Sequence, residues 1–327
     1  MGNAVASPKI DVHHHIIPPA FKKAWEDNPA LSQGFKLPSW SPGESLEFMQ
    51  RHNISTSILS LGAPATSMGV DGHAVAAFCR EMNRYAADLC KQHPRKFGFM
   101  ATLPSLEDTA ACIEELCYAL DELGADGVNL LTSYGGKYLG HPQFGPVWDE
   151  LDRRSAVVFI HPGLETAGDP IREPRVLPAP IVDWTHETTR TATHLITTGT
   201  FRRHAACKII LPHGGGTLPY VARRVATLSA AFGLVDGGKT AEEFLDEARS
   251  FYYDVAFAGY QEPLRLLLDF AKPGHVLYGS DYPFGREAMV EEQLKAVDKI
   301  IDMRVDADDI RRGAAIRLWP RLGRDAD

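Results

Sequence analysis

The chain has 327 residues, 44% of them hydrophobic, which is enough for a sizeable core, and we expect one large α/β domain over residues 1–327. A formal net charge of −8 without any dense basic cluster argues against nucleic acid and anionic membranes as partners. The five cysteines contain no C-x-x-C pair, and neither a signal peptide's apolar core nor a membrane-length apolar run is present, so we expect a cytosolic protein with reduced thiols.

Short apolar runs alternate with longer helical patterns along the whole chain. Strands are expected at 9–13, 56–61, 96–103, 126–131, 156–161, 208–213, 251–257 and 275–281. Helices are expected within 72–92, 107–124, 143–154, 185–203, 260–271 and 287–303, with Ser105 and Asp108 capping the second of them. Eight apolar strands separated by helices predict a (β/α)₈ TIM-type barrel, with an open doubly wound sheet as the alternative.

Two segments differ in composition from these repeating units. Residues 18–43 are rich in Pro, Trp and Ser, and we expect this insertion near the amino terminus to cover the mouth of the barrel. Residues 164–184 carry four prolines and suit a long ordered loop over the site.

Three consecutive histidines stand in the stretch KIDVHHHIIPPAF, residues 9–21. In an extended strand alternate side chains share a face, so His13 and His15 point one way and His14 the other. That arrangement would put two imidazoles on one ion. The tripeptide alone is equally compatible with solvated histidines at a polar strand end.

Other ligand-capable side chains stand at the carboxyl ends of further predicted strands. His13 and His15 end the first strand, His161 the fifth, His213 the sixth and Asp281 the eighth. In a barrel these ends converge on one face, where such enzymes build their active sites. Two or three imidazoles with a carboxylate suit Zn²⁺, and they would also hold Mn²⁺ if substrate oxygens completed the coordination.

Several other enzyme classes lack their motifs here. His213 opens HGGGTLPY, and HGGG also occurs in the oxyanion loops of lipases and esterases, but no G-x-S-x-G nucleophile elbow accompanies it. The chain contains neither G-x-x-x-x-G-K-[ST] nor G-x-G-x-x-G. A serine hydrolase and a nucleotide-dependent enzyme are therefore disfavoured.

Four motifs, IDVHHH, IHPG, LPHGGGTLPY and YGSDYPFG, stand in this order over nearly the whole chain. Together they resemble the aminocarboxymuconate-semialdehyde decarboxylase family, the decarboxylase branch of the amidohydrolase superfamily. Within that branch the chain looks most similar to the small fungal decarboxylases of 6-methylsalicylate. The resemblance implies a metal-dependent carboxy-lyase that forms a homo-oligomer, either a dimer or a tetramer.

The resemblance also implies roles for individual residues. His13, His15, His161 and Asp281 match the metal ligands, and His213 matches the active-site acid/base. His14 matches no functional position, so it should face away and its replacement by alanine should affect decarboxylation little. The fourth predicted strand ends VNLLTS, without the lysine that bridges two metals in hydrolytic members, so one divalent ion per chain is implied.

Residues that contact the substrate are also expected near these motifs. A carboxylate favours a cationic partner, and an aromatic ring favours an aromatic wall. The candidates are Arg172, Arg175 and Arg190 for the carboxylate, Trp184 for the wall, and Glu187 as a contact to the substrate or to a ligand histidine.

The expected reaction is non-oxidative loss of CO₂ from a small 2-hydroxybenzoate, foremost 6-methylsalicylate to 3-methylphenol. We expect Asp281 to deliver the proton to the carboxyl-bearing carbon, with His213 as second candidate or as the group that supplies Asp281. Two alternatives share the scaffold, namely a metal-dependent hydrolase of a lactone or amide and a non-catalytic metal-binding barrel.

Overall fold

The computed structural model describes residues 6–27, 36–62, 72–163, 171, 173–285 and 287–323. Its centre is an eight-stranded sheet in which every neighbouring pair is parallel, in the order β1-β2-β3-β4-β7-β8-β9-β10. The strands are β1 (Lys9–Ile16), β2 (Ile54–Leu61), β3 (Phe97–Thr102), β4 (Gly127–Leu131), β7 (Val157–His161), β8 (Lys208–Leu211), β9 (Tyr252–Asp254) and β10 (Val276–Leu277). Each contains or overlaps one predicted strand.

Backbone hydrogen bonds between β1 and the chain after β10 close this sheet into a barrel. The Val12 N–H donates to the Tyr278 carbonyl at 3.0 Å, and the Asp281 N–H donates to the His13 carbonyl at 2.8 Å. The His15 N–H donates to the Tyr282 carbonyl at 2.7 Å. The predicted TIM-type barrel is therefore confirmed, and an open sheet is excluded.

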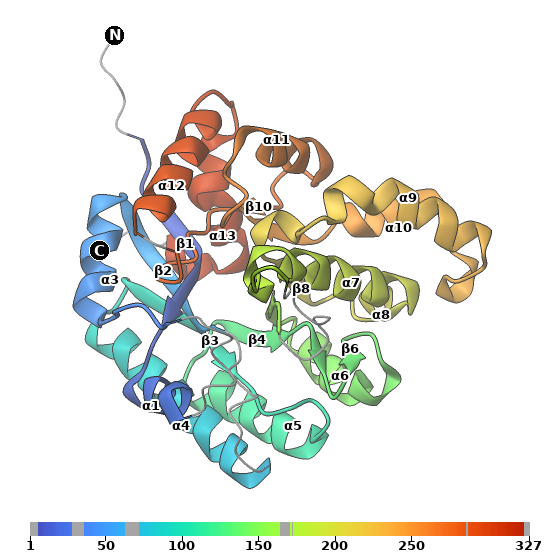
Figure 1. Cartoon of the computed structure of the whole chain (residues 1–327). Coiled ribbons are helices and arrows are strands. Elements are labelled where there is room, and N and C mark those ends of the chain that lie inside the picture. The colour runs from blue at the N-terminus through green and yellow to red at the C-terminus, as the bar shows by residue number, and fades with distance from the viewer. Residues whose placement is uncertain are drawn as a thin grey trace.

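Helices surround the barrel on its outer side (Figure 1). They are α1 (Pro19–Asp27), α3 (Pro42–Arg51), α4 (Gly72–Gln92), α5 (Thr109–Cys117), α6 (Gly145–Arg153), α7 (Asp183–Thr197), α8 (Thr200–Arg203), α9 (Leu218–Ala231), α10 (Ala241–Arg249), α11 (Gln261–Phe270), α12 (Glu287–Ile301) and α13 (Ala314–Leu318). All six predicted helical stretches contain helix. The sequence reading missed α1, α3, α9, α10 and α13.

Two of the predicted helices depart from a single regular helix. The stretch 185–203 is divided into α7 and α8 at Gly199, whose φ of 71° lies in the left-handed region. The stretch 107–124 continues from α5 into a π-helical turn, Tyr118–Glu122. Asp108 is the N-cap of α5, because its carboxylate accepts the Ala111 N–H at 3.1 Å. Ser105, the other member of the expected capping pair, precedes the helix, and its Oγ accepts the Glu107 N–H at 3.3 Å instead.

Apolar side chains fill the barrel and close one of its ends. One buried cluster joins residues from several strands with the carboxy-terminal segment, namely Ile10, Ile58, Met100, Phe159, Ile210, Leu277 and Trp319. The Trp319 indole N–H donates to the Asp126 carbonyl at 2.7 Å, just before β4 begins. The amino ends of the strands are thereby covered, and chemistry is left to the carboxyl ends.

The two segments of unusual composition are only partly described. Within 18–43 the structure contains α1, whose fully buried Phe21 belongs to one apolar cluster with Leu61 and Met82. Within 164–184, residues 164–170 and 172 lie outside the described residues. The remainder ends in a 3₁₀ turn, Ala179–Ile181, and the first turn of α7.

In the described part of the chain, no helix combines the length and the apolar character that crossing a bilayer requires.

Candidate metal centre and active site

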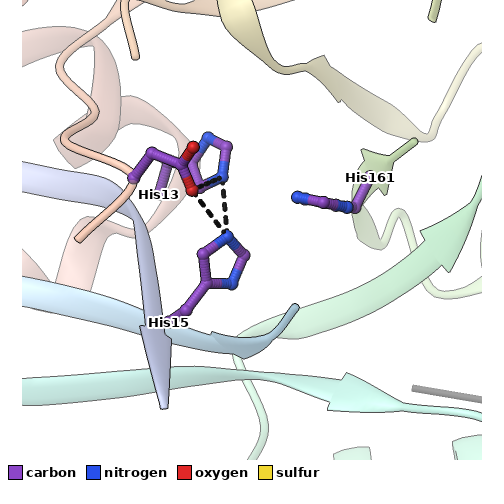
Figure 2. Close-up of side chains that lie close together, drawn as sticks. His13, His15 and His161 are labelled. Carbon is purple, nitrogen blue, oxygen red and sulfur yellow. Dashed lines mark hydrogen bonds and ion pairs between the residues drawn. The ribbon is translucent and has the colours of Figure 1, made fainter. Parts of the chain in front are cut away.

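Four buried side chains converge at the carboxyl ends of the strands. His13 and His15 come from β1, His161 ends β7, and Asp281 follows β10, and one ligand atom from each lies within 4.8 Å of every other. Figure 2 shows the three imidazole rings turned toward one another. The Nε2 atoms of His13 and His15 are 2.9 Å apart and lie 3.2 and 3.0 Å from Asp281 Oδ1.

The remaining ring nitrogen of each histidine, Nδ1, has a hydrogen-bond partner that fixes the ring. The pairs are His13 with Asp254 Oδ2 at 2.9 Å, His15 with Ser60 Oγ at 3.1 Å and His161 with the Pro162 carbonyl at 2.9 Å. Such partners hold a histidine with its Nε2 lone pair toward an ion. The nearest donor atoms are separated by about the 3 Å expected for ligands each ~2.1 Å from one ion. The four residues therefore form a buried His/His/His/Asp metal site.

The charges of this cluster are strongly coupled. Burial disfavours protonation of His13, but the carboxylates of Asp254 and Asp281 outweigh it and raise the pKa of His13 to about 10. Burial lowers the pKa of His15, and burial with the neighbouring imidazoles holds the pKa of His161 well below its ordinary value. Burial opposes ionisation of Asp281, yet the charge of His13 and the surrounding hydrogen bonds hold its pKa well below the usual range.

His213 completes the predicted constellation. It begins the 3₁₀ turn His213–Gly215 after β8, and its Nε2 lies 3.4 Å from Asp281 Oδ2. Its ring centre is 5.0 Å from that of His13. His213 and Asp281 have φ values of 55° and 59°, which non-glycine residues rarely adopt. Both backbones are thus held in uncommon conformations at the site.

His14 faces away from the metal site, as the strand alternation predicts. It is fully buried, its Nδ1 lies 3.0 Å from Asp11 Oδ2, and its Nε2 lies 3.0 Å from Ser45 Oγ of α3. The alternative of solvated histidines at a strand end is wrong, because all three histidines are buried.

Aromatic rings pack around the metal site. The Trp184 ring meets that of His161 edge-on at 5.4 Å, and its buried Nε1 has no hydrogen-bond partner among the described residues. Phe284 lies 5.1 Å from His15, and Phe159 lies 4.9 Å from His13, between ring centres. The sequence reading missed both phenylalanines, although Phe284 stands within YGSDYPFG.

The remaining candidates for substrate contact are Glu187 and three arginines. The Glu187 carboxylate accepts the Tyr138 hydroxyl at 3.0 Å and the Arg190 guanidinium at 2.9 Å. Each ligand histidine has its Nδ1 on another group, and a contact of Glu187 with one of them stays a prediction. Arg190 is 58% exposed, Arg175 is exposed, and Arg172 lies outside the described residues.

Comparison with known proteins places this site in a family. The family model described as Amidohydrolase matches residues 10–321. "Decarboxylase macB" of Penicillium terrestre is 46% identical over 96% of this chain and 95% of its own length. "6-methylsalicylic acid decarboxylase acuB" of Aspergillus aculeatus is 43% identical over 97% of each chain.

A solved structure shares the fold at lower identity. It is a dihydroxybenzoic acid decarboxylase from Polaromonas, determined with bound manganese and the inhibitor 2-nitroresorcinol, and it is 22% identical with a TM-score of 0.77 over 98% of both chains. The family model and these relatives match nearly the whole chain, including the strand ends that carry the buried metal site. The chain belongs to the amidohydrolase family, in its branch of metal-dependent decarboxylases.

Proposed function

We propose that this protein removes CO₂ without oxidation from a small 2-hydroxybenzoate, with 6-methylsalicylate as first substrate and 3-methylphenol as its product. The observation that carries the proposal is the contact of His213 Nε2 with Asp281 Oδ2 at 3.4 Å, which sets this histidine against one of the four residues of the buried metal site. The Aspergillus aculeatus relative supports the substrate by its name, whereas the name of the Penicillium terrestre relative leaves the substrate open.

One divalent ion would be held by His13, His15, His161 and Asp281. When bound, it supplies Lewis acidity and a template for the oxygens of the substrate. The nitrogen-rich donor set favours Zn²⁺, while the manganese in the Polaromonas structure supports Mn²⁺ as the alternative.

The reaction needs a proton at the ring carbon that bears the carboxylate. Direct loss of CO₂ would leave an electron pair in the ring plane, where the ring cannot delocalise it. Protonation of that carbon first gives a ketone-like ring whose carbonyl accepts the electrons of the breaking carbon–carbon bond. The proton replaces CO₂ on the ring, so the step balances without an oxidant or a reductant.

Asp281 and His213 would deliver this proton as a pair. Asp281 would lie next to a substrate bound at the metal, but its depressed pKa means that it needs a neighbour that supplies protons. His213 Nε2, at 3.4 Å from Asp281 Oδ2, is that neighbour. Asp281 thus hands on the proton, and His213 replaces it.

The aromatic rings around the site would form the walls of the substrate pocket. Trp184 and Phe284 lie against two of the ligand histidines, so a flat substrate at the metal would contact them. The Trp184 N–H, which has no partner within the described part of the chain, would donate to a substrate oxygen. For the carboxylate we retain Arg190 and Arg172 as candidates, with Glu187 and Tyr138 holding Arg190 in place.

The test compares Asp281→Asn and His213→Ala with the wild type at saturating metal. Because general acid catalysis contributes roughly 10²–10⁴-fold, each variant should lose at least about 100-fold in CO₂ release. His93→Ala, at the amino end of β3 and against Phe97, is the matched control and should keep wild-type activity. Wild-type activity in Asp281→Asn would remove it as proton donor, and hydrolysis of a lactone or amide without CO₂ release would favour the hydrolase alternative.

A further inference from the structure

A second buried carboxylate, Asp254, lies between the metal site and His213. It ends β9 and is fully inaccessible to solvent. It is not one of the four ligands, and it is too deeply buried to serve as a surface charge. A buried carboxylate needs partners for both of its oxygens, and those partners show what it holds in place.

The two oxygens of Asp254 serve different parts of the site. Oδ2 lies 2.9 Å from Nδ1 of the ligand His13. Oδ1 accepts two backbone N–H groups, those of His213 and Ala256, each at 3.0 Å. One carboxylate therefore joins a ring that would bind the metal to the backbone of the proposed acid/base.

Tight packing keeps Asp254 in this position. A Cβ atom at Gly279 would lie 3.0 Å from the Cβ atoms of both Asp254 and His13, so the chain leaving β10 presses against both residues. On the other side, a Cβ at Gly215 would lie 2.5 Å from the Tyr253 ring, so the HGGG turn lies directly on β9. Asp254 has little room to adopt another rotamer.

The backbone bond to Asp254 acts on a residue in an uncommon conformation. His213 has a φ of 55°, and the three glycines that follow also have positive φ. A non-glycine residue keeps such a conformation only where its surroundings hold it there. The bond from the His213 N–H to Asp254 is one such restraint on the turn that carries the His213 ring.

These contacts form a closed cycle through the site. Asp254 contacts His13, His13 Nε2 lies 3.2 Å from Asp281 Oδ1, and Asp281 Oδ2 lies 3.4 Å from His213. The His213 backbone then returns to Asp254. We propose that Asp254 is a positioning residue that fixes the His13 tautomer for metal binding and the His213 turn for proton transfer. The inference rests on the proposed function, since both roles belong to it.

Asparagine at this position can satisfy only one of the two duties. If its carbonyl oxygen accepts from His213 and Ala256, its NH₂ group faces His13 Nδ1 and favours the tautomer with the proton on Nε2, which cannot bind metal. If the amide is reversed, its NH₂ group faces two backbone donors, and the His213 turn loses its acceptor. Either orientation harms the site without changing the volume of the side chain.

The experiment measures metal affinity and kinetics for Asp254→Asn. The apparent Kd for Zn²⁺ is obtained by competition with a chromophoric chelator, and kcat and KM are measured at saturating metal. Loss of a partner that orients a ligand typically costs 10–100-fold in metal affinity. We expect a Kd raised by that factor, a kcat lowered at least about tenfold by the loosened His213 turn, and a KM within about threefold of wild type.

Asp11→Asn is the matched control. Asp11 is equally buried, and its Oδ2 contacts Nδ1 of His14, the neighbouring histidine outside the ligand set. Its Oδ1 accepts the backbone N–H groups of His13 and Ser280, and the amide oxygen of asparagine can still accept both. We expect Asp11→Asn to lower the melting temperature while its Kd for Zn²⁺ stays within about threefold of wild type. Equal losses of affinity in both variants would overturn the inference, because they would reflect a general loosening of β1.

Asp254→Glu keeps the charge and is the second variant in case the asparagine variant does not fold. It should recover much of the metal affinity, while its longer side chain displaces the His213 turn and keeps kcat low. Wild-type affinity and kcat in either Asp254 variant would refute the inference. A wild-type protein without metal or CO₂ release would instead refute the proposed function.

Discussion

Replacing His14 with alanine tests whether the middle histidine of the triplet is structural. Its imidazole is fully buried between Asp11 and Ser45, and its ring centre lies 5.0 Å from that of Tyr282. Truncating a buried side chain of this size costs about 2–4 kcal/mol through lost packing and the cavity that remains. Loss of the hydrogen bonds to Asp11 and Ser45 adds only about 1 kcal/mol, because both residues keep other hydrogen-bond partners.

The remaining partners of Asp11 and Ser45 limit the loss of stability in His14→Ala. Asp11 Oδ2 still accepts the Ser280 hydroxyl at 2.6 Å, and Ser45 Oγ still accepts the Trp40 indole N–H at 2.9 Å. We therefore expect His14→Ala to lose about 3–5 kcal/mol in the free energy of unfolding. The site itself should remain intact, since His14 points away from it.

The assay pairs His14→Ala with His15→Ala. Urea unfolding gives the loss of stability, and chelator competition gives the apparent Kd for Zn²⁺ of both variants. His14→Ala should keep its metal affinity within about threefold, whereas His15→Ala should lose at least about 100-fold by removal of a ligand. A His14→Ala protein of wild-type stability, or one that has lost its metal, would refute the reasoning from strand alternation and burial.

Two further predictions follow from the titrating groups. His13 has a pKa of about 10 without metal, and its imidazole must be neutral to bind an ion, so Zn²⁺ binding near pH 7.5 should release about one proton per chain. The affinity for Zn²⁺ should accordingly rise about tenfold per pH unit up to about pH 9. Calorimetry in two buffers of different ionisation enthalpy counts the released protons, and a count of zero or of three would contradict this prediction. None of the five cysteines forms a disulfide, and burial raises the pKa of their thiols, to about 12 for Cys112 and Cys207. The thiols of the native protein should therefore react slowly with a thiol reagent at pH 8, whereas all five should react quickly in the unfolded protein. One fast-reacting thiol in the native protein would contradict this prediction.

The barrel was predictable because its strands are buried on both faces and stand out as apolar runs. The ends of the last two strands were not, since the predicted runs 251–257 and 275–281 shorten to β9 and β10. At β9 the cause is Asp254, which accepts the Ala256 N–H and turns the chain. Apolarity marks burial, and it does not show where the extended backbone stops.

Two of the missed helices, α9 and α10, were missed for different reasons. Helix α10 carries a capping box in which Thr240 and Glu243 bond each other's backbone, and this T-x-x-E signal was present in the sequence. In α9, apolar and small residues mix with arginines, so its helical period is weak.

At the site, the metal ligands and His213 were predictable from their motifs, whereas the residues that hydrogen-bond the ligand histidines were not. His13, His15, His161, His213 and Asp281 meet as expected because each stands at the carboxyl end of a strand. Asp254 stands at such an end in the structure, but the predicted strand continued to residue 257, so the sequence did not show this position. Ser60 has no signal in the sequence either, because its role depends on the register that sets it beside His15.

The most direct test of metal-dependent decarboxylation is one experiment on purified wild-type protein. Its metal content is determined, and CO₂ and the organic product are followed during incubation with 6-methylsalicylate. We expect about one Zn²⁺ or Mn²⁺ per chain and stoichiometric conversion to 3-methylphenol and CO₂. A protein that holds no divalent metal, or one that holds it and releases no CO₂ from this or any related hydroxybenzoate, would contradict the proposed function.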